Sequence, residues 1–144
     1  MNISIREGTP KEVAKLTWQI PEFLHPYKAI DYKERTSGKE YLFLIAEAEG
    51  KQVGFKAGYA LSDKTFYSWM GGVLPDFRGY KIASKLAGEQ EKKLKKMGFS
   101  TIRLKTRNRH KAMIQFLLKN NFYIIDCNKK GEVPDFRIIF EKRL

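Results

Sequence analysis

The sequence predicts an α/β protein of mixed α+β type, in which about four helices flank a mostly antiparallel central sheet of about seven strands. Two patterns carry this prediction. Three apolar or alternating segments between residues 41 and 74 are separated by tight turns, which predicts an antiparallel meander. A strand, an amphipathic segment and another strand follow over residues 66–106, and such a crossover is right-handed and makes its two strands parallel.

The size and charge of the chain limit its class. A chain of 144 residues fits one domain spanning residues 1–144, and roughly 70% of the unfolded surface is buried at this length. The formal net charge is +12, from 28 Lys and Arg against 16 Asp and Glu. This charge indicates either an anionic partner, such as nucleic acid, a membrane surface or a phosphorylated ligand, or solubility alone.

Cysteine content and hydropathy indicate the compartment. Cys127 is the single cysteine, which excludes an internal disulfide and a multi-cysteine zinc site and suits a reducing cytoplasm. Because Cys127 lies in an apolar segment, we expect it in the core. No segment has the length needed to span a bilayer, and the N-terminus has no apolar signal region. We therefore expect a cytoplasmic protein with no membrane partner.

The N-terminal segment predicts a short strand over residues 3–6 and a helix that begins after Thr9. Thr9 can cap this helix, Pro10 suits its first position, and Glu12 nearly completes a capping box. The inward stripe of the helix is expected to contain Val13, Leu16 and Trp18. Two prolines then predict a broken helix or a loop over residues 20–35.

The meander is expected to comprise strands over residues 41–48, 52–61 and 65–74. In the second strand Gly54, Lys56 and Gly58 share one face of the alternation. A helix is expected over residues 82–97, with a charged outer side and a glycine stop at Gly98. Its inward stripe contains Ala83, Leu86, Ala87, Gln90, Leu94 and Met97.

The C-terminal third predicts a strand over residues 101–106, a helix over residues 111–120, and two strands over residues 123–127 and 136–142. Asn120 and Asn121 tolerate the left-handed conformation that ends a helix.

The turn between the third meander strand and the following helix predicts an anion site. Residues 71–83 contain glycines, a proline and two cationic side chains between an apolar strand and the helix. A helix leaves its first backbone N–H groups without intrahelical partners, and these groups together with the helix dipole favour phosphates. Ligands of such mixed sheets also lie beyond the carboxyl ends of the strands. A pyrophosphate site is therefore expected here.

The run from Val73 to Ala83 resembles the acetyl-coenzyme A motif of the GNAT superfamily of N-acetyltransferases, Q/R-x-x-G-x-G/A after a V-x-P strand end. Arg78 fills its first position and Ala83 its last. Asn108 stands after the next strand, as an Asn does in the family, and Asn121 with Phe122 replaces a closing Gly-Phe pair. The order of the predicted elements also resembles this fold, so the resemblance covers nearly the whole chain.

The resemblance implies an acetyl-CoA-dependent N-acetyltransferase that uses no metal. It implies that the parallel strands splay apart, that backbone N–H groups of the turn bind the pyrophosphate, and that the pantetheine arm bonds the open strand edge. The implied coenzyme-binding residues are Gly72, Val73, Leu74, Arg78, Gly79, Tyr80, Lys81, Ile82, Ala83 and Asn108. The implied reaction is direct attack by a primary amine in a ternary complex, with a small molecule or peptide as acceptor and a homodimer left open.

Two positions depart from the family pattern. Lys81 stands where the family has its middle Gly, and its side chain either obstructs the phosphate or adds an ammonium to the site. Many relatives carry a Tyr general acid four residues before the closing Gly, and counting back from Asn121 gives Leu117. Water or another side chain must then protonate the leaving thiolate, or the step proceeds without this help.

No catalytic residue follows from the sequence. An amine with a pKa near 10.4 is deprotonated in only about one molecule in a thousand at neutral pH, so a base or desolvation must assist. A backbone N–H near Val73 is expected to meet the developing oxyanion. The side chains that could reach a cleft at the strand ends are Glu47, Tyr59, Tyr67 and His110.

Two functions of other classes remain open. The Lys81 and Leu117 departures are consistent with a non-catalytic acyl-CoA-binding domain. The charge and the basic runs at residues 92–96 and 107–111 are consistent with a nucleic-acid-binding domain. Against nucleic acid as a partner, the basic residues are scattered over several elements and no known reader motif is present.

Overall fold

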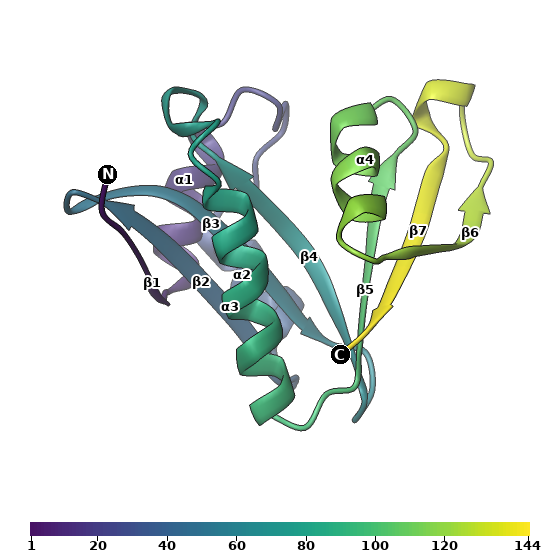
Figure 1. The fold of residues 1–144 in the computed structure, drawn as a ribbon, viewed down its shortest axis with the longest axis horizontal. Helices are drawn as coiled ribbons and strands as arrows, with labels where there is room; N and C mark the ends of the chain where they lie inside the picture. The colour runs from purple at the N-terminus through teal and green to yellow at the C-terminus, as the bar shows by residue number, and fades with distance from the viewer.

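The computed structural model describes residues 1–144, and Figure 1 shows helices on both faces of one twisted sheet. The elements follow in the order β1 (Ile3–Glu7), α1 (Pro10–Trp18), α2 (Ala29–Thr36), β2 (Tyr41–Ala48), β3 (Lys51–Ala60), β4 (Thr65–Val73), α3 (Ile82–Lys96), β5 (Thr101–Arg107), α4 (Lys111–Lys119), β6 (Tyr123–Asn128) and β7 (Arg137–Arg143). Single 3₁₀ turns occur at Pro75–Phe77 and Val133–Asp135.

The strands form a seven-stranded sheet in the order β1-β2-β3-β4-β5-β7-β6. All neighbouring strands are antiparallel except β4 and β5, which are parallel and joined through α3. The predicted meander, the predicted crossover and the mixed sheet with four helices are therefore confirmed.

The parallel strands β4 and β5 are hydrogen-bonded to each other over a short stretch only. The β4–β5 ladder begins at Thr65–Thr101 and ends at Tyr67–Arg103, and beyond it the two strands diverge (Figure 1). The register between β3 and β4 changes at Trp69, where β4 has one extra residue. This is a β-bulge, and it lies just past the last parallel pair. A bulge bends its strand and increases its twist, so β4 turns away from β5 at this point. We call the opening between β4 and β5 beyond Tyr67–Arg103 the gap.

Local sequence signals set several element ends as expected. Thr9 Oγ1 accepts a hydrogen bond from the Glu12 N–H at 3.2 Å, and Glu12 Oε1 accepts one from the Thr9 N–H at 3.0 Å. This completes the capping box of α1. Asn121, just after α4, has a φ of 68°, the left-handed conformation that ends the helix.

The sheet separates two apolar clusters. Helices α3 and α4 cover one face, and α1 and α2 cover the other (Figure 1). On the α3 side, Ile82, Leu86 and Leu94 pack on Phe66 and Phe140. The side covered by α1 and α2 contains Val13, Leu16, Tyr32, Phe43, Ile45, Phe55, Ala57 and Leu74. Two faces of packed side chains hold β4 and its turn at a fixed position.

Some sequence-based expectations are wrong. Ala83 and Met97, expected on the inward stripe of α3, are exposed. Trp18 does not join the inward stripe of α1 but is 60% exposed, and its indole Nε1 donates to the Tyr27 carbonyl oxygen at 3.1 Å. Cys127 is exposed rather than in the core, because β6 is the edge strand and all of its residues are exposed. An apolar run predicts a strand, but it does not predict which strand lies at the edge. None of the helices is long and apolar enough to cross a membrane.

Candidate active site

The turn before α3 presents unpaired backbone donors. None of the backbone N–H groups from Gly79 to Ser84 donates a hydrogen bond within the protein, and the first helical bond of α3 is from the Lys85 N–H to the Lys81 carbonyl oxygen at 3.1 Å. Gly79, with a φ of 88°, has open space where a side chain would begin. The N–H groups expected at Gly79, Tyr80, Lys81, Ile82 and Ala83 are thus free, and Ser84 adds another.

Lys81 occupies a strained backbone position. Its φ of 62° and ψ of 26° are left-handed, and this conformation costs a non-glycine residue roughly 1–2 kcal/mol. The side chain is exposed and forms no ion pair or hydrogen bond within the protein. The left-handed backbone explains why a glycine would suit this position of the motif. The Lys81 side chain is available to an anion at the turn.

The Arg78 guanidinium is held by protein groups. Its Nη1 and Nη2 donate to the two oxygens of Glu22 at 2.7 and 2.9 Å, and its Nε donates to the Val73 carbonyl oxygen at 3.1 Å. Arg78 holds the pKa of the Glu22 carboxyl below its usual range, and the nearby His110 charge adds to this shift. Arg78 therefore ties the turn to the segment between α1 and α2, with its charge already neutralised by Glu22.

Along the end of β4, the backbone N–H and C=O groups point alternately toward β3 and toward the gap. The Leu74 N–H donates to the Val53 carbonyl oxygen in β3 at 2.8 Å, and its own carbonyl oxygen accepts from the Phe77 N–H at 2.9 Å. Because an antiparallel strand alternates its hydrogen-bonding direction, Gly72 also faces β3, while Gly71 and Val73 face the gap. The edge expected near residues 72–74 is thus provided by residues 71 and 73, and the Leu74 backbone is not free.

Gly72 has a packing role as well. A Cβ at this position would lie 2.7 Å from Ile20 Cδ1 and 3.4 Å from Phe23 Cε2. The absence of a side chain lets the segment after α1 lie directly on β4. This segment also carries Glu22, so the close approach at Gly72 positions the partner of Arg78.

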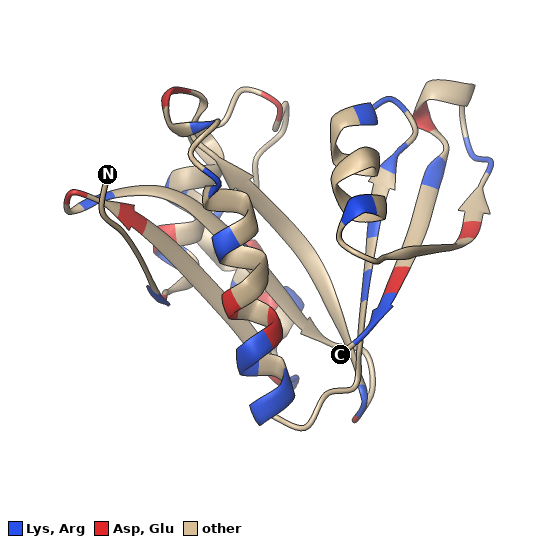
Figure 2. Ribbon diagram, viewed as in Figure 1, with Lys and Arg blue, Asp and Glu red and all other residues tan.

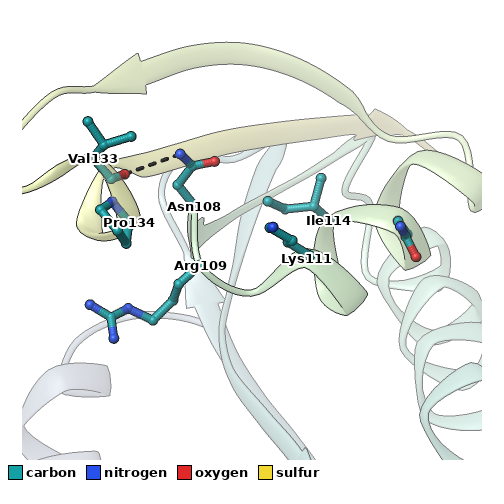
Figure 3. A pocket seen from close by; sticks show the side chains of 7 residues that line it. Asn108, Arg109, Lys111, Ile114, Val133 and Pro134 are labelled. Carbon is teal, nitrogen blue, oxygen red and sulfur yellow. Dashed lines mark hydrogen bonds between the residues drawn. The ribbon is translucent and has the colours of Figure 1, made fainter.

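Asn108 lies beyond the end of β5, at the same edge of the sheet as the turn (Figure 1). Its Nδ2 donates to the Val133 carbonyl oxygen at 3.2 Å, which leaves Oδ1 as a free acceptor (Figure 3). A pocket of about 410 Å³ opens here between the start of α4 and the 3₁₀ turn before β7. Its lining residues are Asn108, Arg109, Lys111, Ile114, Gln115, Val133 and Pro134.

The four side chains considered as bases divide into two groups. Glu47 lies on β2, outside the gap, and is bonded by Arg6 Nη2 at 3.2 Å. His110 is exposed at the start of α4. Tyr59 and Tyr67 stack edge to face on β3 and β4 with ring centroids 5.5 Å apart. Burial raises the pKa of Tyr67, so its hydroxyl is a poor base at neutral pH.

Leu117, at the position of the family's general acid, is buried in the core under α4. The structure instead reveals Lys56, which sequence reasoning did not single out. Lys56 Nζ donates to Ser68 Oγ at 3.1 Å, and the buried Gln90 donates to the same oxygen at 3.2 Å. Burial lowers the pKa of Lys56 to about 8, opposed by the charge of Glu91.

The position of Lys56 relates it to the gap. Ser68 directly follows Tyr67, the last residue of β4 that pairs with β5, so the Lys56 ammonium lies at the closed end of the gap on the α3 side. The alternation of Gly54, Lys56 and Gly58 is the signal that could have identified it, since a lysine on the face that a helix covers is unusual. Lys56 is partly buried, and an amine with a lowered pKa in such a position is typical of functional sites.

Basic residues are spread over several elements. Figure 2 shows Lys and Arg at the C-terminal end of α3, along β5 and β7, and around the start of α4. Arg107 and Arg109, just before α4, both pair with Asp135.

The residues present fit a coenzyme A molecule. Unbonded backbone donors stand at a helix N-terminus, and the free edge of β4 leads from them toward the closed end of the gap. From Val73 back to Trp69 this edge is about 13 Å long at roughly 3.3 Å per residue. No group of three or more His, Cys, Asp or Glu side chains is placed to hold a metal ion.

Comparisons with known proteins agree with this geometry. A family model described as acetyltransferase (GNAT) family matches residues 11–122. An acetyltransferase of Pectobacterium atrosepticum is 31% identical over 134 residues, which cover 92% of this chain and 94% of the relative. The crystal structure of Ard1 from Thermoplasma volcanium superposes with a TM-score of 0.85 at 18% identity, over 100% of this chain and 99% of that chain. The PaiA N-acetyltransferase of Thermoplasma acidophilum, in complex with coenzyme A, gives 0.75 at 24% identity, with 100% of both chains covered.

Proposed function

Because this chain belongs to the acetyltransferase (GNAT) family and is an enzyme that uses acetyl-CoA, we propose that it transfers the acetyl group to a primary amine by direct attack in a ternary complex. The observation that carries the proposal is the gap. Its β4 edge and the turn before α3 both offer unbonded backbone N–H groups, and the two strands leave room between them. A site of this form lets two reactants meet from opposite faces of one sheet.

The coenzyme would be held mostly by the backbone. The N–H groups of Gly79 to Ser84 bind the pyrophosphate, the exposed Lys81 ammonium adds a point charge, and the β4 edge at Gly71 and Val73 binds the arm. Asn108 Oδ1 is a further acceptor for the arm's amide groups. When bound, acetyl-CoA supplies an acetyl group activated as a thioester.

The protein must favour the neutral form of the acceptor amine. Reaching the free amine from an ammonium of pKa 10.4 costs roughly 4–5 kcal/mol at neutral pH. The aromatic side chains Tyr67 and Trp69 stand on the side opposite α3, next to the gap. Desolvation by these rings lowers the pKa of an amine placed there. The Val73 N–H, directed into the gap, is positioned to meet the carbonyl oxygen as it gains charge.

Lys56 is the candidate proton donor. Its ammonium is at the closed end of the gap, and its pKa of about 8 lies close to that of a thiol. A donor whose pKa is near that of the leaving group and near the working pH transfers its proton with little penalty. We assign Lys56 Nζ the role of protonating the leaving sulfur, the role that Leu117 cannot perform.

The test is a steady-state assay with a panel of primary amines, in which products are identified by mass spectrometry. We expect acetylated amine, intersecting initial-velocity patterns and no acetylated enzyme on the pathway. The Cys127→Ser variant is expected to retain full activity, because Cys127 lies on β6 at the edge of the sheet. Parallel velocity patterns with an acetylated enzyme, or no transfer to any amine, would contradict the proposal.

A further inference from the structure

An aromatic floor lies on the face of the sheet opposite α3. Tyr59 stacks edge to face on Tyr67 and on Trp69, with centroid distances of 5.5 and 5.7 Å. Tyr67 is only partly buried, and its hydroxyl forms no hydrogen bond within the protein. The floor borders the gap, because Tyr67 is the last residue of β4 that pairs with β5 and Trp69 is the bulge residue beyond it.

Cationic side chains surround this floor. The Arg35 guanidinium lies 4.6 Å from the centre of the Trp69 ring and donates to Tyr59 Oη at 3.3 Å. Across the gap, Lys105 Nζ on β5 lies 5.6 Å from the centre of the Tyr67 ring. Arg137 on β7 pairs with Arg107 on β5, so these two side chains lie on the same face of the sheet. Lys105 is two residues before Arg107 on β5 and therefore lies on this face as well.

The same cationic neighbours also influence the pKa of the Tyr67 hydroxyl. Burial raises the pKa of Tyr67, while the positive charges of Arg35 and Arg137 oppose the rise. Arg35 contacts this floor directly, and the strand register places Arg137 on the same face as Lys105. We call Arg35, Lys105 and Arg137 the cation triad.

The cation triad has no carboxylate partner. The ion pairs of the protein involve other basic residues, and Glu141, the nearest acid on β7, is paired with Arg103 at 2.8 Å. On α2, Asp31 and Glu34 line the same pocket as Arg35 and Trp69, but neither forms an ion pair with Arg35, and Asp31 accepts from the Lys28 backbone N–H. Cations on one face that have no ion-pair partner attract an anion.

We propose that this face holds the acceptor and that the acceptor is a primary amine carrying carboxylate groups. The proposal rests on the acetyl transfer proposed above and adds the substrate class. The carboxylates pair with Arg137, Lys105 and Arg35, while the amine reaches into the gap past Tyr67 and Trp69. The same positive charges disfavour a protonated amine, so the triad both recognises the acceptor and lowers the pKa of its amine.

The experiment measures binding separately from turnover. The protein, saturated with coenzyme A, is titrated calorimetrically with the peptide Ser-Asp-Glu-amide and with its neutral counterpart Ser-Asn-Gln-amide. Free glutamate and glutamine form a second matched pair, which separates an amino acid from a peptide as the source of the carboxylates. We expect the acidic member of at least one pair to bind at least about tenfold more tightly, an advantage that falls with added salt.

Variants locate the preference. Arg137→Gln and Arg35→Gln are expected each to lose about tenfold in affinity for the acidic ligand and to leave the neutral ligand unchanged. Arg137→Glu should remove the preference altogether. Lys129→Gln, an exposed residue in the β6–β7 loop, is the matched control and should bind like the wild type.

The outcomes separate the two proposals. Equal binding of acidic and neutral ligands, no measurable binding of either acidic ligand, or a preference that survives all the triad variants overturns the substrate class. A triad-dependent preference for acidic ligands supports it even when no acetylated product forms, and that result would count against the acetyl transfer alone.

Discussion

Arg78 and Glu22 form a two-bond ion pair between segments far apart in the chain, with Nη1–Oε2 and Nη2–Oε1 distances of 2.7 and 2.9 Å. The pair joins the turn before α3 to the segment that follows α1. One partner stands next to the unbonded N–H groups that are proposed to bind phosphate, and the other lies on the segment that packs on Gly72. We therefore expect coenzyme affinity to depend on the segment that covers the opposite face.

The first prediction concerns this ion pair. Arg78→Glu places a carboxylate beside Glu22 and beside the phosphate turn, so we expect coenzyme A affinity to fall at least tenfold by calorimetry. Glu22→Gln should weaken binding less, and the free energy of unfolding should change by no more than about 1 kcal/mol, since both side chains are about half exposed.

A charge swap distinguishes an indirect role of Arg78 from a direct one. If Arg78 acts by holding the turn, the double variant Glu22→Arg, Arg78→Glu recovers part of the lost affinity. No recovery would mean that the Arg78 guanidinium itself contacts the ligand.

Lys81→Gly is expected to stabilise the protein by up to about 1 kcal/mol, because relief of a left-handed lysine outweighs the flexibility that glycine adds to the unfolded chain. We expect coenzyme A binding to be unchanged or tighter. Urea denaturation and calorimetry measure the two effects. A large loss of affinity would show that the Lys81 ammonium contributes directly to phosphate binding.

Acetyl-CoA should raise the melting temperature. At 100 times its Kd a ligand that binds only the folded state contributes about 2.7 kcal/mol, which corresponds to several degrees in a chain of this size. Differential scanning fluorimetry measures the shift. No shift at millimolar acetyl-CoA would argue against the assignment of the turn and the gap as its site.

Lys56→Met should lower kcat by roughly 100-fold, the lower range for loss of a general acid. In the wild type, activity should fall above a pH of about 8 as Lys56 loses its proton, and this limb should be absent in the variant. Lys92→Met, on the exposed side of α3, is the control. A retained alkaline limb in Lys56→Met would assign the proton donor elsewhere.

Acid stability should depend on Glu12. Arg6 donates hydrogen bonds to Glu12 and lowers the pKa of this carboxyl from 4.5 to about 2. A lowered pKa in the folded state contributes stability that is complete above pH 4.5 and is lost as the pH falls toward 2. Glu12→Gln should therefore cost about 1 kcal/mol at pH 7 and almost nothing at pH 2. The exposed Glu132→Gln should show no such difference in urea denaturation.

Much of the fold was determined by the sequence alone, because the signals are local. The capping box at Thr9 and Glu12 set the start of α1, alternation defined the meander, and a residue tolerant of a left-handed φ at Asn121 ended α4. The resemblance over residues 73–83 identified the family, and the proposed phosphate turn was expected from a glycine-containing turn between a strand and a helix. These properties involve residues only a few positions apart.

The tertiary structure decided what depends on contacts between distant segments. Only pairing across strands shows that β4 and β5 part after Tyr67–Arg103 and that Leu74 is bonded to β3. The partner of Arg78, the partial burial of Lys56 on the α3 side and the gathering of the cation triad each join residues from separate elements. Charge and burial act through space rather than along the chain, so the same residue can be a solvated lysine or a proton donor according to which helix covers it.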